Sequence, residues 1–368
     1  MSILDDTSTI DVADDGPRRP RERQGSLNVV REIIPAACYR RSGARAAVAL
    51  AQGFALYLVP MVGLALTDRW YLVLPLWALA GLAVSGLFVL GHDASHGALL
   101  DSPRLNRLVA QVCMVPSAHV EAAWDLGHNR IHHGYTTRQG FDFVWHPTTP
   151  DEFRQMGRLA RLQHRIEWSF LGSGAYFLRT VWWQKMWRFN APGKRKGAII
   201  RDKITLGSLM VLATAGAVVY GALTGGWVHA LWVPVKLFVV PFLIFIHVIG
   251  WTVYVHHVDP EIKWWTRKEW TQFHGQMDST TIPYVLRLIN RSVPQHLRAR
   301  AASRGRADPL PPTAGRRRGH PGGVPRHRAL GEAVDALVPA GRQVVQAVRL
   351  RRRPLASLQR RQVLTDPS

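Results

Sequence analysis

Cysteine is scarce in this chain of 368 residues. The two cysteines, Cys38 and Cys113, lie far apart, and neither belongs to a CxxC pair. A disulfide framework and a cysteine-rich zinc site are therefore excluded, because both need several cysteines at characteristic spacings. The first 25 residues also lack an apolar core, being acidic and then arginine-rich, so no cleavable signal peptide is expected.

The last 78 residues lack eight residue types. Between positions 291 and 368 there is no Phe, Tyr, Trp, Ile, Met, Asn, Lys or Cys, whereas Arg occurs 17 times beside four acidic residues. This tail supplies +13 (17 − 4) of the formal charge of +22, and residues 1–290 supply +9 (30 − 21). Since the tail carries the excess charge but no aromatic side chain to stack on bases, we expect disorder there and no nucleic-acid partner.

Long apolar runs dominate the rest of the chain. Four of them, residues 44–66, 71–91, 204–223 and 231–255, approach or exceed the ~20 apolar residues that cross a bilayer. The pattern predicts an all-α integral membrane protein with four transmembrane helices and a helical cap. Residues 1–35 are expected to form a disordered arm, 36–290 the membrane domain and 291–368 the tail.

Basic residues indicate the orientation. The arm and the segment 92–202 are rich in arginine and lysine, whereas the two short links between paired spans contain only one basic residue, Arg69. Cytoplasmic loops carry the excess of basic residues, so the N-terminus and the cap are expected on the cytoplasmic face of a bacterial-type inner membrane. The segment 105–120 is too short and interrupted to span, and 167–187 mixes aromatic with basic residues, so both are expected at the membrane interface.

Histidines gather where the predicted spans end. His92 and His96 follow the second span, and four residues along a helix return to the same face, so both imidazoles can reach one ion. In "HNRIHH" the same spacing pairs His128 with His132. His133 then turns about 100° away, toward a second ion or the other side of the first.

A third histidine pair, His256 and His257, follows the fourth span and returns to the same face of the membrane. His247 lies inside that span and is interpreted as a buried polar residue that bonds a neighbouring helix. Four other histidines are predicted not to be ligands: His146, His164, His229 and His274.

A site built from many imidazoles suits iron, copper or zinc and disfavours magnesium or calcium. Asp93 and Asp125 lie close to these histidines in the sequence. They are either acids that orient the ligating rings or solvated acids at helix ends.

These motifs resemble those of the membrane fatty acid desaturase family, most closely its acyl-lipid omega-type members. "HDASH" matches the first histidine box, "HNRIHH" the second, and "YVHHVDPEIKWW" the stretch after the fourth span, while "DSPRLNRLV" and "WDLGH" are also similar. The resemblance covers residues 44 to about 290. It implies metal ligands at His92, His96, His128, His132, His133 and His257, with His256, Asp93 and Asp125 as possible additional or supporting groups.

The resemblance also implies the chemistry. Two non-haem iron ions would use O2, and two electrons from a ferredoxin or cytochrome-type donor, to remove two hydrogens from an acyl lipid or acyl thioester. Removing hydrogen from an unactivated methylene needs an oxidant that no side chain supplies, so the protein must position and shield a cofactor.

One family feature is missing, the late HxxHH box. After residue 290 only His296, His320 and His327 remain, and none has the box spacing. Yet "LRARAASRGRADP" (297–309) can be encoded by codons that, read one nucleotide later, give F-V-H-V-P-H-H-V-D-A-R-I-P. "QAVRLRRRPLAS" (346–357) is likewise compatible with K-L-Y-D-F-D-A-G-R-W-L-P in the same shifted frame.

The hypothesis is therefore a slip of the reading frame near residue 290, which would leave the literal chain poor in iron and in activity. Other functions remain open from the sequence. They are a related di-iron lipid or carotenoid hydroxylase, a non-enzymatic membrane haem or zinc protein, and nucleic-acid binding by the tail.

Overall fold

The computed structural model describes residues 27, 39–189, 193–259 and 262–279. The predicted arm, apart from residue 27, and the predicted tail with its displaced box lie outside these residues. Within the described ranges the chain is helical, with one isolated bridge between Arg138 and Trp265 and no β-strand. The all-α class is therefore confirmed for this part.

Two apolar helices form an antiparallel pair. α2 (Gly43–Leu66) starts where the Ser42 hydroxyl accepts a hydrogen bond from the backbone N–H of Arg45. α3 (Trp70–Ser95) follows after a three-residue turn and continues four residues past the predicted end of its span. Both helices are long and apolar enough to cross a membrane. Their contact is made by small and branched side chains that exclude solvent: Leu64, Val73 and Ala80.

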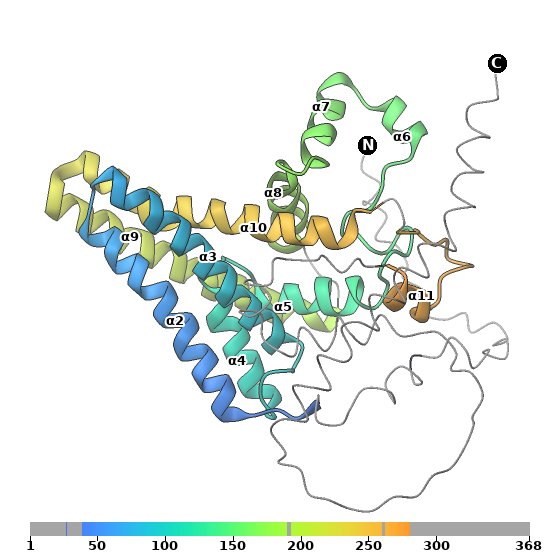
Figure 1. The fold of residues 1–368 in the computed structure, drawn as a ribbon, viewed down its shortest axis with the longest axis horizontal. Coiled ribbons are helices and arrows are strands. Elements are labelled where there is room, and N and C mark those ends of the chain that lie inside the picture. Colours follow the sequence, from blue (N-terminus) through green and yellow to red (C-terminus); the bar gives the residue numbers. More distant parts are fainter. Residues whose placement is uncertain (1–26, 28–38, 190–192, 260–261, 280–368) are drawn as a thin grey trace, which may run out of the picture. The chain divides into compact units, whose positions relative to one another are not determined.

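The third candidate span is one apolar segment, Gly193–His257. It contains η5 (Gly193–Arg195), α9 (Lys196–Pro234), η6 (Val235–Val239) and α10 (Val240–His257). The backbone leaves helical geometry at Gly225 and Gly226, and the latter has φ of +76°, which favours glycine. A Cβ on Gly221 would lie 2.6 Å from the carbonyl oxygen of His229, so the chain folds back on itself there. The third and fourth predicted spans thus fall within a single, sharply bent segment (Figure 1).

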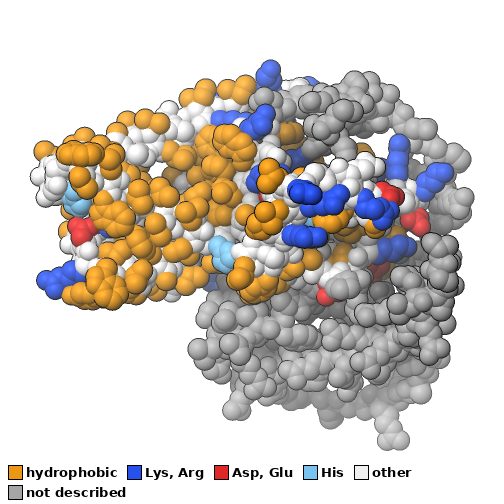
Figure 2. All heavy atoms as spheres, turned by 90° about the horizontal axis from the view of Figure 1, so that it is seen from above, with side chains coloured by type: hydrophobic (Ala, Val, Ile, Leu, Met, Phe, Trp, Pro, Cys, Tyr) orange, Lys and Arg blue, Asp and Glu red, His pale blue; other side chains and the backbone are white. Residues whose placement is uncertain are grey.

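The outer faces of these helices are apolar and uncovered. Leu56 is 68% exposed, Val59 71% and Leu223 82%. Figure 2 shows hydrophobic side chains across much of the surface of this helical part. Such a surface is stable only against lipid, since soluble proteins rarely leave apolar patches of this extent uncovered. The chain is an integral membrane protein.

Shorter helices occupy the segment between α3 and α9 and the end of the described chain. They are α4 (Pro103–Met114), α5 (Glu121–Trp124), η3 (Asp125–His132), α6 (Pro150–Gln155), α7 (Arg158–Glu167), α8 (Ser173–Tyr176), η4 (Phe177–Trp187) and α11 (Gln272–Met277). The largest buried cluster joins several of them to the spans, with Phe88 of α3, Phe177 of η4 and Phe245 of α10 at its centre. This cluster fixes the ends of α3 and α10 against each other.

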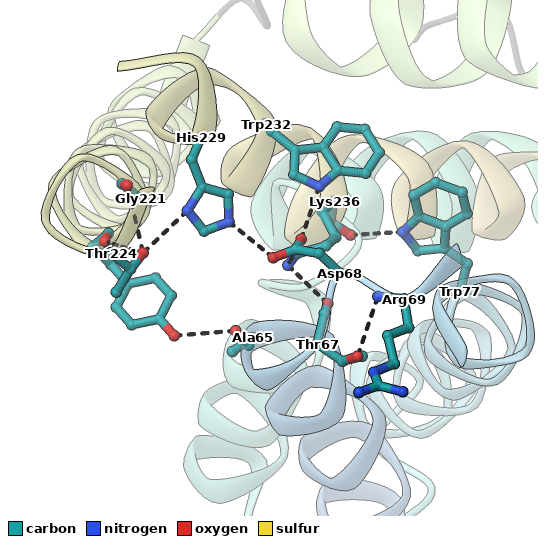
Figure 3. A network of polar contacts seen from close by, with 11 residues as sticks. Ala65, Thr67, Asp68, Arg69, Trp77, Gly221, Thr224, His229, Trp232 and Lys236 are labelled. Carbon is teal, nitrogen blue, oxygen red and sulfur yellow. Dashed lines mark hydrogen bonds and ion pairs between the residues drawn. The ribbon is translucent and has the colours of Figure 1, made fainter. Parts of the chain in front are cut away.

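A polar clasp, defined here as Asp68, His229, Trp232 and Lys236, ties the α2–α3 turn to α9 and η6 (Figure 3). The Lys236 ammonium is fully buried and donates to the Asp68 carboxylate at 2.6 Å and to the Thr67 carbonyl at 3.0 Å. Trp232 Nε1 donates to the same carboxylate at 3.0 Å, and His229 Nε2 lies 3.1 Å from it. Burial raises the pKa of Asp68, but hydrogen bonds from Lys236 and Trp232 outweigh it and leave that pKa below its usual value.

Removing the clasp carboxylate is expected to destabilise the fold. Asp68→Ala leaves the buried Lys236 charge without its partner, which costs ~3–5 kcal/mol for a fully buried pair and less here because Asp68 is half exposed. Thermal unfolding of the purified protein in detergent measures this loss. The double variant Asp68→Ala/Lys236→Met removes both charges and should recover most of the stability. Equal stability of the single variant and the parent would contradict this interpretation of the clasp.

Candidate metal centre

The first histidine pair lies at the end of α3. His92 is in the last turn of the helix and His96 directly follows it. Because α3 extends beyond the apolar run, the four-residue spacing brings both rings to one face, with their Nε2 atoms 3.3 Å apart. The predicted pairing of His92 with His96 is therefore seen in the structure.

The second histidine cluster lies on a π-helical turn, η3. In a π-helix the backbone bonds join residues five apart, and here the N–H of His133 donates to the carbonyl of His128 at 3.0 Å. The ring of His128 consequently pairs with that of His133, with Nε2 atoms 3.1 Å apart. The rings of His128 and His132, which the four-residue spacing predicted on one face, are also neighbours, with centroids 5.5 Å apart.

Four imidazoles from α3 and η3 converge: His92, His96, His128 and His133. One nitrogen of each lies within 4.8 Å of the others, and Nε2 of His92 is 2.9 Å from Nε2 of His128. Burial, and then the neighbouring histidines, hold the pKa of His128 well below its usual value. The ring is thus neutral and keeps a lone pair, which is the state that a metal ligand needs. We call this set the four-histidine position.

His132 points to a different partner. It is buried, and its ring centroid lies 4.8 Å from that of His257 at the end of α10. The third histidine segment is therefore brought to the other two, as the sequence predicted. His132 and His257 lie beside the four-histidine position, since the ring centroid of His132 is also 5.2 Å from that of His133. His256, next to His257, is half-buried.

Asp142 is a site residue that sequence reasoning missed. Its fully buried carboxylate lies 2.9 Å from Nδ1 of His132 and accepts backbone N–H groups of Thr137 at 2.9 Å and Val144 at 3.0 Å. These bonds fix the carboxylate, which in turn fixes the His132 ring through Nδ1, so Nε2 is the nitrogen that could hold a metal ion. The available signal was an acid within "GFDFVW", a stretch that is otherwise apolar.

The two acids singled out from the sequence have different surroundings. Asp93 is buried, and its carboxylate lies 3.1 Å from Nδ1 of His92, so it orients a ring of the four-histidine position. Asp125 instead binds Arg195 at 2.7 Å and Arg130 at 3.4 Å. Burial raises the pKa of Asp125, but the hydrogen bonds from Arg195 and Asn129 prevail and lower it. Its contacts thus place it in an ion-pair network beside the site.

Trp124 is a second residue that was not singled out as part of the site. Its ring stacks on His128 with centroids 4.3 Å apart and an interplanar angle of 20°. It also packs edge-on against Phe88 of the main core. Trp124 therefore forms an apolar wall that holds the His128 ring in place and limits the access of water.

The histidines predicted to be non-ligands have other partners. His229 belongs to the clasp, and His274 pairs with Asp278 at 3.0 Å. His247 packs against Gly174 but is exposed, so the interpretation of it as a buried residue was wrong. His146 and His164 pack on the rings of Trp264 and Trp168, respectively.

The two buried acids provide a test that separates the two parts of the site. Asp93→Asn is expected to lower the affinity of the four-histidine position for Co²⁺ by ~10–100-fold, the usual effect of losing an orienting carboxylate. Asp142→Asn is the matched control, because Asp142 holds His132, which lies outside that position. Absorbance titration with Co²⁺ measures both. Equal losses of Co²⁺ affinity in the two variants would contradict the division of the site into the four-histidine position and the part around His132.

Comparisons with known proteins agree with these features. The family model "Fatty acid desaturase" matches residues 68–291, which is more than half of the chain. The chain is 28% identical over 238 residues to the "sn-1 oleoyl-lipid 12-desaturase" of Picosynechococcus sp., covering 62% of this chain and 65% of that protein. The chain thus spans just under two thirds of that relative's length.

Two further relatives show the same relationship. The "sn-1 oleoyl-lipid 12-desaturase" of Arthrospira platensis is 24% identical over 306 residues, which cover 79% of this chain and 83% of that protein. The "sn-1 acyl-lipid omega-3 desaturase (ferredoxin)" of Synechocystis sp. is 25% identical over 270 residues, 70% of each chain. Because the family model matches more than half of the chain, and the arrangement of the histidines agrees with it, the chain belongs to the fatty acid desaturase family.

Proposed function

We propose that this protein catalyses the O2-dependent desaturation of an acyl chain at a di-iron site whose ligands are histidines. The observation that carries the proposal is the convergence of His92, His96, His128 and His133 at the end of a spanning helix, in a chain of the desaturase family. The names of the similar proteins favour an acyl-lipid substrate, and one of them includes ferredoxin as the donor. An acyl thioester and a cytochrome-type donor are the alternatives within the same proposal.

The donor set fits iron at one position. Four imidazoles whose nitrogens lie within 4.8 Å of one another suit a first-row transition metal ion, and the thiolates that would favour zinc or an iron–sulfur cluster are absent from the cluster. Beside it, His132 and His257 would hold a second ion, with His256 adjacent. Two described histidines are few for such an ion, so this second position needs ligands from elsewhere.

When bound, the iron pair would supply the oxidising power that removing hydrogen from a methylene requires. The chain's own residues perform the positioning. Asp93 and Asp142 fix the rings of His92 and His132, and Trp124 stacks on His128. The ends of α3 and α10 place these groups where apolar helices meet the polar cap, so an acyl chain can approach from the lipid side.

We propose four membrane crossings, with the bend at Gly225–Gly226 between the third and the fourth. Four crossings return the chain to the face it left, which is consistent with the contact between His132 and His257. The basic arm and central segment favour the cytoplasm for that face, in a bacterial-type inner membrane.

We further propose that the reading frame slips near residue 290 and that the literal chain is therefore impaired. The family match ends at residue 291, at the point where the arginine-rich composition begins. The shifted frame supplies an HxxHH box, and the second position beside His132 and His257 is the part of the site that needs ligands.

Product analysis tests the proposed reaction. A chain read in the shifted frame, expressed with a ferredoxin and its reductase in a host that makes only monounsaturated fatty acids, is expected to add a double bond to membrane lipids. Mass spectrometry of the fatty acids would detect the loss of two hydrogens. A product that gains one oxygen would instead establish a hydroxylase, and a haem absorption band with no product would establish a haem protein.

A further inference from the structure

An uncovered apolar stripe runs along α7 in the cap. Leu159, Leu162 and Ile166 are spaced at three and four residues, so they share one face of the helix. They are 83%, 55% and 50% exposed. A helix of a protein interior buries such a face, and a fully solvated helix lacks one. The stripe therefore needs an occupant.

The stripe forms one wall of an open groove of about 420 Å³. Ala175 of α8 and Leu178 of η4 form the opposite wall. One edge of the groove is closed by Glu167, whose carboxylate binds the guanidinium of Arg179 through two hydrogen bonds and accepts another from Gln163 at 2.9 Å. The negative charge of Glu167 is thus neutralised by Arg179 along that edge, and the rest of the groove lining is mainly apolar.

The other edge of the stripe is cationic. With about 100° between successive helical residues, Arg158, Arg161 and Arg165 lie together on the side of α7 away from Glu167. Arg158 and Arg165 are exposed. Figure 2 shows basic side chains gathered over one region of the described surface. An apolar stripe bordered by arginines is the pattern of helices that lie in the headgroup layer of anionic membranes.

Contacts with α10 place this groove close to the bilayer. The turn after α7 packs Phe170 edge-on against Trp251, with ring centroids 5.6 Å apart. α8 approaches α10 closely, because a Cβ on Gly174 would lie 2.9 Å from Cα of His247 and one on Gly250 would lie 2.7 Å from the Ser173 carbonyl oxygen.

These contacts lie six to ten residues before the end of α10 at His257. At a rise of 1.5 Å per residue, that is ~9–15 Å along the helix, within the depth of the headgroup and outer acyl region. Figure 1 shows α7 and α8 projecting sideways from α10 at this level. The membrane span itself therefore brings the groove to lipid.

We propose that the groove between α7 and η4 binds an acyl chain of an anionic phospholipid, whose phosphate lies beside Arg158 and Arg165. The lipid would come from the same leaflet as the histidine face. This binding does not depend on the iron site or on the reaction proposed above, since none of the groove residues contacts the histidines of the metal centre in the described structure.

Spin labelling of the full chain tests the proposal. Cys38 and Cys113 are replaced by Ser and Ala, and a nitroxide is attached at Leu162→Cys on the stripe or, as the matched control, at Ala160→Cys, which is exposed on the same helix but does not line the groove. The protein is reconstituted in bilayers of phosphatidylethanolamine and phosphatidylglycerol. The accessibility of each label to O2 and to a water-soluble nickel chelate is then measured.

The expected result is a severalfold higher ratio of O2 to nickel accessibility at position 162 than at 160. A second variant, Arg158→Gln/Arg165→Gln, should reduce the dependence of this ratio on phosphatidylglycerol. Equal, water-like ratios at both positions would overturn the proposal. Protection of position 162 that develops only when an acidic ferredoxin is added would also overturn it and would identify the groove as a protein-docking surface.

Discussion

The literal chain is expected to bind one metal ion tightly, and a chain read in the shifted frame after residue 290 is expected to bind two. The first ion would occupy the four-histidine position, whose nitrogens are within 4.8 Å of one another. The second would lie beside His132 and His257, where two described histidines are too few to hold an ion against the competition of water and buffer.

The shifted frame would alter this balance, because codons compatible with residues 297–309 would add an H-V-P-H-H box. Three further imidazoles would complete the ligand shell of the second ion. Iron content per chain, measured by mass spectrometry of the purified and desalted protein, tests the prediction. The control is a shifted chain in which the three box histidines are replaced by alanine, which should return to one ion. Two ions in the literal chain would contradict the frame-slip hypothesis.

Loss of His128 is expected to have the largest effect of any single histidine. Its Nε2 lies 2.9 Å from that of His92 and 3.1 Å from that of His133, so it links the histidines of α3 to those of η3. His128→Ala should weaken metal binding by more than the ~10–100-fold that loss of an orienting partner causes. In the shifted chain it should also abolish product formation.

His274→Ala is the matched control for this variant. His274 pairs with Asp278 and stacks on Trp265 in the cap, and it is not one of the four histidines of that position. It should leave metal affinity within about twofold of the parent, because surface substitutions away from such features have small effects. Thermal unfolding of both apo variants would show whether the fold is retained. Retention of tight Co²⁺ binding by His128→Ala would contradict the assignment of this ligand.

The sequence predicted which segments would meet. Histidines at the ends of apolar runs have matching depth, because a span of fixed length places its ends at the membrane faces. For this reason His92 lies beside His128, and His132 lies beside His257. Two of the four predicted crossings appear as separate candidate spans. The other two fall within one apolar segment, Gly193–His257, which bends at Gly225 and Gly226.

The details of the centre could not be predicted in the same way. The spacing of His128, His132 and His133 predicted an α-helix, but η3 is a π-helical turn, which brings the ring of His133 beside that of His128 in addition to the ring of His132. A π-helix has no distinctive composition, so only the structure reveals it. Asp142 lies ten residues beyond His132 in a loop, and its role depends on the path of that loop.

The fatty acid profile of one host expressing three chains tests the central claim most directly. The chains are the literal sequence, the shifted-frame sequence and the shifted-frame sequence with His128→Ala, each produced at the same level in the membrane with the same electron donor. New double bonds in the lipids are expected for the shifted chain alone. Equal desaturation by the literal chain, or by the His128→Ala variant, would contradict the central claim.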